Sequence, residues 1–166
     1  EETRRQRVAT ELTRLSDEIL YSAQRTGREK RELAGKAAAW EAIFAASLEA
    51  SIALDKAGVI THVNPAAERL LRVTAQEIIG KALVDVMLPP THRSPDNANF
   101  AGDLAGGRAS GRRQELVAQR HDGRQFPLEV SVAEFKNGHE IGYIVGARDI
   151  SAHRRLRAEL ARAREI

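Results

Sequence analysis

Two dipeptides in which an Asx residue precedes glycine constrain the carboxy-terminal part of this chain more than any other feature. Asp122-Gly123 and Asn137-Gly138 each separate runs of β-prone residues, and such dipeptides favour the tight turns of β-hairpins. The flanking runs predict three antiparallel strands, over residues 114–120, 126–135 and 141–148. In the middle run apolar and polar side chains alternate, which indicates a sheet covered on one face.

A second pair of strands is predicted before this meander. Residues 51–55 and 59–63 are β-prone and flank a tight turn at Gly58. The helix signals that follow lie between the two groups of strands. Two strands, then short helices, then three strands predict an α+β fold in which a five-stranded antiparallel sheet is covered by helices on one face.

Local cap and stop signals place the short helices. Asn64-Pro65 predicts a helix to Arg72, because asparagine caps helices well and proline suits the first turn. Thr74 and Glu77 have capping-box spacing for a second helix. Two further helices are expected, over residues 82–88, before two prolines, and over residues 97–104, before a glycine-rich loop.

The first 47 residues predict a long helix, since they contain no proline and consist mostly of good helix formers. The apolar residues show the 4-3-4 spacing of a coiled-coil seam. The seam residues are Val8, Leu12, Leu15, Ile19, Leu33 and Trp40. A helix of this length needs a partner, most simply a second copy of itself.

The middle of this seam is polar. Ser22, Thr26 and Glu29 occupy the seam positions there, and Gly27 lies among them. A glycine inside a helix costs about 1 kcal/mol relative to alanine, so we expect a kink or short break near residues 25–29. Two interpretations stay open: a weakened zipper where helix registry can change, or a simple boundary between two helices.

The charge distribution argues against a nucleic-acid binder. Residues 1–49 contain nine basic and nine acidic side chains, and residues 50–150 contain twelve of each. The excess of positive charge is confined to residues 151–166, where five arginines face two glutamates. A basic final turn is typical of a solvated helix, so we expect no nucleic-acid partner.

Composition also limits the chemistry. The chain has no cysteine, which excludes disulfides, thiolate metal sites and a cysteine nucleophile. It shows no apolar run long enough to span a bilayer and no secretion signal, so we expect a cytoplasmic protein without direct membrane contact. Neither a phosphate-binding glycine loop nor a catalytic constellation stands out, and we predict a regulatory module that is not an enzyme and has no metal site.

A series of short strings from about Trp40 to Ser151 resembles one known family in order and spacing. They include Ile52-Ala53-Leu54-Asp55, Val63-Asn64-Pro65-Ala66-Ala67, Glu77-Ile78-Ile79-Gly80, Arg120-His121-Asp122-Gly123, Phe126-Pro127-Leu128-Glu129-Val130-Ser131 and Arg148-Asp149-Ile150-Ser151. This pattern is similar to that of PAS sensory domains. The last string resembles the Asp-Ile-Thr junction of that family, with serine in place of threonine.

The resemblance implies a three-part organisation. Residues 1–47 would form a signalling helix, residues 48–150 the PAS domain, and residues 151–166 an output helix. Arg148, Asp149, Ile150 and Ser151 would couple the sheet to that output helix. Such modules sit within larger chains, upstream of histidine kinase, cyclic-dinucleotide or chemoreceptor output domains, so the expected partners are a second copy and a covalently linked output domain.

The resemblance leaves the cofactor unknown, and we expect none. His92 is the one histidine near the position of the haem ligand in related oxygen sensors, but that position falls at Asp96. A small organic acid would need a basic group, for which Arg93, Arg112 and Arg113 are candidates. The alternatives to a dimeric relay are therefore a haem- or small-ligand-binding sensor and an adaptor whose sheet binds a partner protein.

Overall fold

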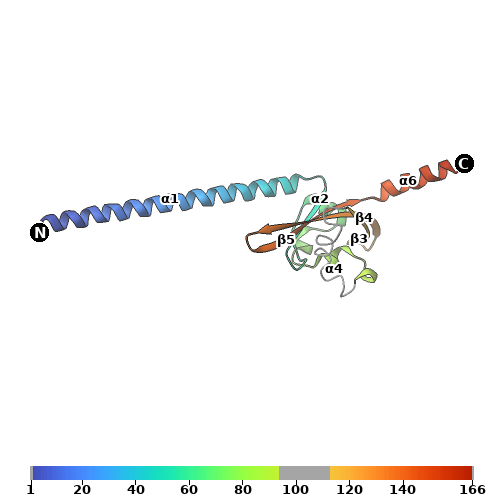
Figure 1. Ribbon diagram of the computed structural model, residues 1–166. Helices are drawn as coiled ribbons and strands as arrows, with labels where there is room; N and C mark the ends of the chain where they lie inside the picture. The colour runs from blue at the N-terminus through green and yellow to red at the C-terminus, as the bar shows by residue number, and fades with distance from the viewer. Residues whose placement is uncertain (1, 94–112, 166) are drawn as a thin grey trace. The chain divides into compact units, whose positions relative to one another are not determined.

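The computed structural model describes residues 2–93 and 113–165. The helix predicted over residues 97–104 and the candidates Asp96 and Arg112 lie outside the described residues. In chain order the elements are α1 (Glu2–Ala46), β1 (Ala50–Leu54), β2 (Ile60–Val63), α2 (Pro65–Leu71), α3 (Ala75–Ile78), α4 (Leu83–Met87), the 3-10 turn η1 (Pro90–His92), β3 (Gln114–Gln119), β4 (Gln125–Asn137), β5 (Glu140–Asp149) and α6 (Ser151–Arg164) (Figure 1). The chain divides into two compact units, Glu1–Ile43 and Phe44–Ile166.

Helix α1 is a single unbroken helix of 45 residues (Figure 1), so the break predicted near residues 25–29 is wrong. Around Gly27, the Nε of Arg25 donates to the Glu29 carboxylate at 3.1 Å and the Nε of Arg31 donates to the Gly27 carbonyl at 3.2 Å. An ion pair between side chains four residues apart, such as that of Arg25 and Glu29, stabilises a helix by about 0.2–0.5 kcal/mol. A single glycine costs an amount of the same order, about 1 kcal/mol relative to alanine, and the helix continues through Gly27.

The five strands form one antiparallel sheet in the order β2-β1-β5-β4-β3. The predicted meander is confirmed: β3 pairs with β4, and β4 pairs with β5 over ten residues. The turns that join these strands place Gly123 at φ +84° and Gly138 at φ +64°. Glycine adopts this left-handed conformation without steric cost, which explains why the two turns could be located from the sequence.

Helices α2, α3 and α4 contribute their apolar faces to one core with the sheet. The largest fully buried side chains include Ile52, Leu54, Ile60, Leu71, Leu83, Met87, Leu128, Val130 and Val145. They come from both layers and fill the space between sheet and helices. The predicted α+β class, with a sheet covered on one face, is confirmed.

The opposite face of the sheet is partly exposed. Phe135 on β4 is 40% exposed and Val117 on β3 is 38% exposed. The Phe135 ring lies over Gly142: a Cβ atom built at Gly142 would be only 2.4 Å from the Cζ of Phe135.

Among the described helices, none combines the length and the apolar character needed to cross a membrane.

Alanine substitutions at two glycines test the helical backbone at Gly27 and the left-handed turn at Gly58. A Cβ atom at Gly27 or at Gly58 would meet nothing within 4 Å, but Gly58 has φ +80°. Gly27→Ala should therefore stabilise α1 by about 1 kcal/mol, whereas Gly58→Ala should destabilise the sheet domain by about 1 kcal/mol. Thermal melts followed by circular dichroism measure both, and a Gly27→Ala variant that melts earlier than the parent chain would contradict the continuous helix.

Candidate functional site

The end of β5 passes directly into α6, and Ile150 anchors this passage. Its side chain is 3% exposed, and its backbone N–H donates to the Pro127 carbonyl of β4 at 3.1 Å. The first residue of α6 is the next one along the chain. The start of this exit helix is therefore fixed to the sheet by an apolar side chain and a backbone hydrogen bond.

Asp149 connects the helix start to a partly buried cation. One carboxylate oxygen accepts from the Ser151 N–H at 2.9 Å and from the Ser151 hydroxyl at 2.6 Å. The other oxygen accepts from the Arg120 guanidinium at 2.6 Å. The hydroxyl and the N–H of Ser151 therefore both bind the same carboxylate oxygen.

Arg120 is held on several sides. Its side chain is 14% exposed, its guanidinium carbon lies 4.0 Å from the centre of the Phe126 ring, and its Nη1 donates to the Leu70 carbonyl of α2. A cation in this position touches α2, β4 and β5 together. Arg120 thus joins the helical layer to the exit junction through Asp149.

The pKa of Asp149 reflects these contacts. Burial raises the pKa, but the hydrogen bonds from Ser151 and the charge of Arg120 outweigh it, so that the net shift is downward. The carboxylate form is therefore favoured in the folded protein. The junction keeps its charge on Asp149 at neutral pH.

The other predicted junction residue, Arg148, lies elsewhere. It is exposed and forms an ion pair of 2.9 Å with Glu129, which also pairs with Arg113 at 3.1 Å. Successive residues of a strand point to opposite faces, which separates Arg148 from the carboxylate next to it. The structure therefore brings Asp149, Ile150 and Ser151 together at the junction and leaves Arg148 in a surface charge cluster.

A second contact holds α6 one turn later. Arg154 donates to the Glu115 carboxylate of β3 at 2.6 Å, and this hydrogen bond is the main cause that lowers the pKa of Glu115. Both side chains are about half exposed, so the pair contributes little to stability. The pair instead orients the helix, because it holds the side of α6 that carries Arg154 toward β3.

Where the chain enters the sheet domain, the amide of Asn64 organises the start of β1. Its side chain is 1% exposed and accepts from the N–H groups of Ser51 and Ala67, each at 2.9 Å. It donates to the carbonyls of Phe44 at 3.2 Å and Glu49 at 2.9 Å. One amide therefore joins the last turn of α1, the start of β1 and the first turn of α2.

The predicted seam residues all lie exposed on α1. Val8, Leu12, Leu15, Ile19, Leu33 and Trp40 are between 38% and 68% exposed. Leu20 and Tyr21, which do not belong to the seam, are also exposed, at 57% and 70%. The single chain thus leaves a long row of apolar side chains in contact with solvent.

The residues considered for cofactors fall in different places. His92 lies exposed in η1, with its Nδ1 3.1 Å from the Thr91 hydroxyl, and it does not line the cavity described next. His62, His121, His139 and His153 are also exposed. Among the described residues, no group of three or more His, Cys, Asp or Glu side chains could hold a metal ion.

A cavity of about 310 Å³ opens at the edge of the core, beside the end of β3. Its lining residues are Leu71, Val73, Ile78, Lys81, Asp85, Val86, Arg93, Gln119, Arg120 and His121. Of the predicted basic candidates, Arg93 lies here and Arg113 does not. Arg120 was missed as a site residue by sequence reasoning, since nothing local distinguishes it from the many surface arginines.

Comparison with known proteins agrees with this architecture. A family model described as PAS domain matches residues 49–152. The chain is 33% identical over 116 residues to an uncharacterized protein of Azorhizobium caulinodans, and 28% identical over 114 residues to the Sensor protein FixL of Bradyrhizobium diazoefficiens. These matches cover 69% and 68% of this chain but only 16% and 22% of the two relatives.

Solved structures show the same fold. The PAS domain of an HTR-like protein from Haloarcula marismortui aligns with a TM-score of 0.57 at 23% identity, over 74% of this chain and 98% of that one. The alignment covers nearly the whole of that PAS domain. The aligned part of this chain therefore has the size and fold of one such domain, and the chain contains further residues outside the alignment.

Substitution of Asn64 should test the entry amide. Asn64→Ala removes four hydrogen bonds at a buried position and should lower the free energy of unfolding by about 2–3 kcal/mol, measured by urea denaturation. Asn64→Asp retains both accepted bonds but places an anionic oxygen against two carbonyls. The stability of this variant should therefore improve as the pH falls toward protonation of the new carboxyl. Identical pH profiles for the two variants would contradict the donated bonds.

Substitution and acid titration should test the exit carboxylate. Because folding lowers the pKa of Asp149 from its ordinary value of 3.8, its contribution is present above that value and is lost as the pH falls through the folded pKa. Asp149→Asn should cost about 1–2 kcal/mol at pH 7 and should flatten this part of the stability profile. Asp17→Asn, which removes an exposed carboxylate from α1, is the matched control and should change neither.

Proposed function

Because this chain belongs to the PAS domain family, we propose that it is the sensory module of a larger bacterial signalling protein. In this role it forms a homodimer and passes its state through α6 to an output domain. The observation that supports this most directly is the hydrogen-bonded series from Leu70 through Arg120 and Asp149 to Ser151. A displacement in the helical layer reaches the exit helix through these four residues.

The polar contacts at the junction suit a two-state relay. Arg120 is placed by α2 and by the Phe126 ring, while Asp149 accepts from both Arg120 and Ser151. A charge-assisted bond of this kind is strong only over a short range of geometry. A small movement of Arg120 would therefore exchange one arrangement of the helix start for another, and a continuous deformation would be less favourable.

Dimerisation through α1 is supported by its exposed seam. An α-helix of 45 residues is roughly 68 Å long, and its seam residues repeat with the alternating three- and four-residue steps of a coiled coil. Burying them against the same residues of a second copy would remove this apolar surface from water. The second copy is the simplest partner because it presents the same seam in the same register.

The remaining parts of the proposal concern the parent protein. We place the module in the cytoplasm, in a regulatory and not a catalytic role, with a histidine kinase, a cyclic-dinucleotide enzyme or a chemoreceptor as its output. The match to a Sensor protein over 22% of that relative's length supports a module within a longer chain. The balanced charge of residues 50–150 supports a partner other than nucleic acid.

Two adjacent substitutions on α1 test the seam. Ile19 lies on the seam and Leu20 lies beside it, and their exposed fractions are 68% and 57%. Ile19→Glu places a charge in the proposed interface and should shift the monomer–dimer equilibrium toward monomer by at least tenfold, measured by sedimentation equilibrium. Leu20→Glu should leave the equilibrium unchanged.

Truncation provides the complementary measurement. Removal of residues 1–42 should leave a folded domain that is monomeric at the concentrations where the full chain is dimeric. An unchanged dimer after this truncation, or equal effects of the two glutamate substitutions, would show that α1 is not the interface.

A further inference from the structure

The seam of α1 changes character along the helix. Two groups of apolar side chains, within residues 8–19 and 33–43, are between 38% and 74% exposed. The same spacing places four polar residues on the seam, and these are Ser22, Thr26, Glu29 and Lys36. We propose that α1 pairs with a second copy in parallel and in register, and that Glu29 and Lys30 specify this alignment. The inference rests on the proposed dimer and gives its geometry.

The alignment decides which side chains share a layer of the seam. In a parallel pair that is in register, each seam residue faces the same residue of the second copy, so apolar meets apolar and polar meets polar in every layer. An antiparallel pair that overlaps over the whole seam would place Ile19 against the partner's Glu29. A parallel pair shifted by one heptad would place Leu15 against the partner's Ser22, and such a shifted contact does not close on two chains. Both alternatives bury polar groups against apolar ones, which is costly.

Polar side chains at the centre of the seam already have partners within their own helix. The Thr26 hydroxyl donates to the Ser22 carbonyl at 3.0 Å. The Glu29 carboxylate accepts from the Nε of Arg25 at 3.1 Å. A buried polar group is costly mainly when it is left without a hydrogen bond. Thr26 and Glu29 can therefore enter an interface without becoming unpaired.

A charge pair between the two copies exists only in the parallel alignment. With Leu12 and Ile19 at heptad position a, Glu29 occupies position d and Lys30 the following position e. In a parallel pair, a side chain at d packs beside the d and e residues of the other helix. The Glu29 carboxylate of each copy then lies beside the partner's Lys30, which is exposed in the single chain. An antiparallel pair separates these two residues.

The parallel alignment also brings the two chain entries together. Helix α1 ends at Ala46 and β1 begins at Ala50. Both copies would therefore enter their sheet domains from the same end of the paired helices, and a change in the pairing would reach both domains.

Disulfide formation measures the alignment, because the chain has no cysteine and each variant then contains a single thiol. In the parallel pair, Leu15→Cys should form a disulfide-linked dimer by itself, since residue 15 faces its own copy within the reach of a disulfide. In the antiparallel pair, Leu15 faces the partner's Leu33, and a disulfide forms only when Leu15→Cys and Leu33→Cys chains are mixed. Gln24→Cys, on the side of α1 away from the seam, is the control and should not link.

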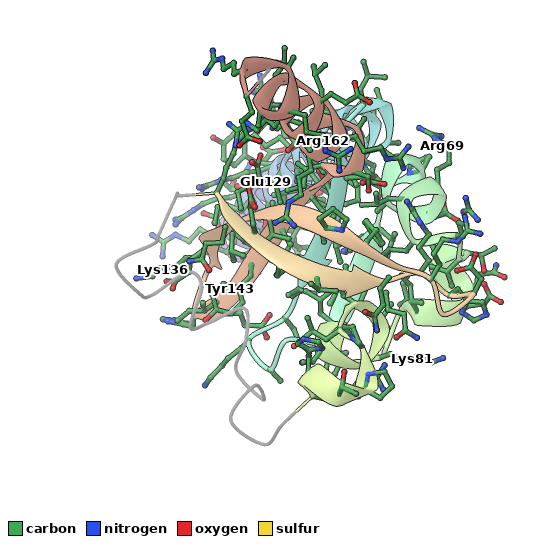
Figure 2. All side chains as sticks on the ribbon, turned by 90° about the vertical axis from the view of Figure 1, so that its right-hand side faces the viewer. Arg69, Lys81, Glu129, Lys136, Tyr143 and Arg162 are labelled. Atoms are coloured by element: carbon green, nitrogen blue, oxygen red, sulfur yellow. The ribbon has the colours of Figure 1, made fainter. Side chains whose placement is uncertain are left out.

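Charge reversal measures the pair of Glu29 and Lys30. Lys30→Glu places a carboxylate beside the partner's Glu29 and should weaken the dimer about tenfold in sedimentation equilibrium. Adding Glu29→Lys restores opposite charges and should recover most of the affinity. Lys136→Glu makes the same charge change at an exposed lysine of β4 in the sheet domain (Figure 2) and should leave the equilibrium unchanged.

Two results would overturn the proposed alignment. One is a Leu15→Cys chain that links only in the mixture with Leu33→Cys, and the other is a double charge reversal whose two effects add instead of compensating. In both cases sedimentation would still show a dimer, so the α1 interface would stand and only its alignment would be wrong. A parent chain that sediments as a monomer would overturn the interface and the alignment together.

Discussion

The carboxylate of Asp149 is the group on which the exit from the sheet depends. It is shielded enough from water to need partners, and it has two of them: Ser151 on one oxygen and Arg120 on the other. One anion therefore satisfies the first free N–H of α6 and neutralises a cation in the domain. Because a shielded charge that loses its partner is costly, neither side of this arrangement can move without affecting the other.

Helix α2 links this exit to the entry of the domain. Its first turn is capped by Asn64, which also binds the carbonyls of Phe44 and Glu49. Near its last turn, the Leu70 carbonyl accepts from Arg120. A helix of only seven residues thus has one end in the entry network and the other in the exit network. Its apolar residues are part of the core, so the packing that holds the sheet also fixes the position of this helix.

The sequence predicted those features that are set by neighbouring residues. The turns at Gly123 and Gly138, the Asn64 cap and the Ser151 helix start are local, and each lies where the pattern indicated. Arg120 depends on pairing between strands that are distant in the chain, so no local signal revealed its partner Asp149. The break predicted at Gly27 was wrong because the prediction counted only the glycine penalty of about 1 kcal/mol. Side-chain contacts one turn away offset that penalty.

The packing of the core limits how a change in one layer of this domain can reach the other. Large aliphatic side chains fill the space between sheet and helices, and opening that space would create cavities whose cost rises with their volume. The cavity beside β3 lies at the edge of this core, where charged residues meet apolar ones. Coupling between sites is typically worth only about 1–3 kcal/mol, which is the scale of one charge-assisted hydrogen bond. A single contact at Arg120 is therefore on the scale needed to connect the helical layer with the start of α6, and a rearrangement of the core is not needed for such a connection.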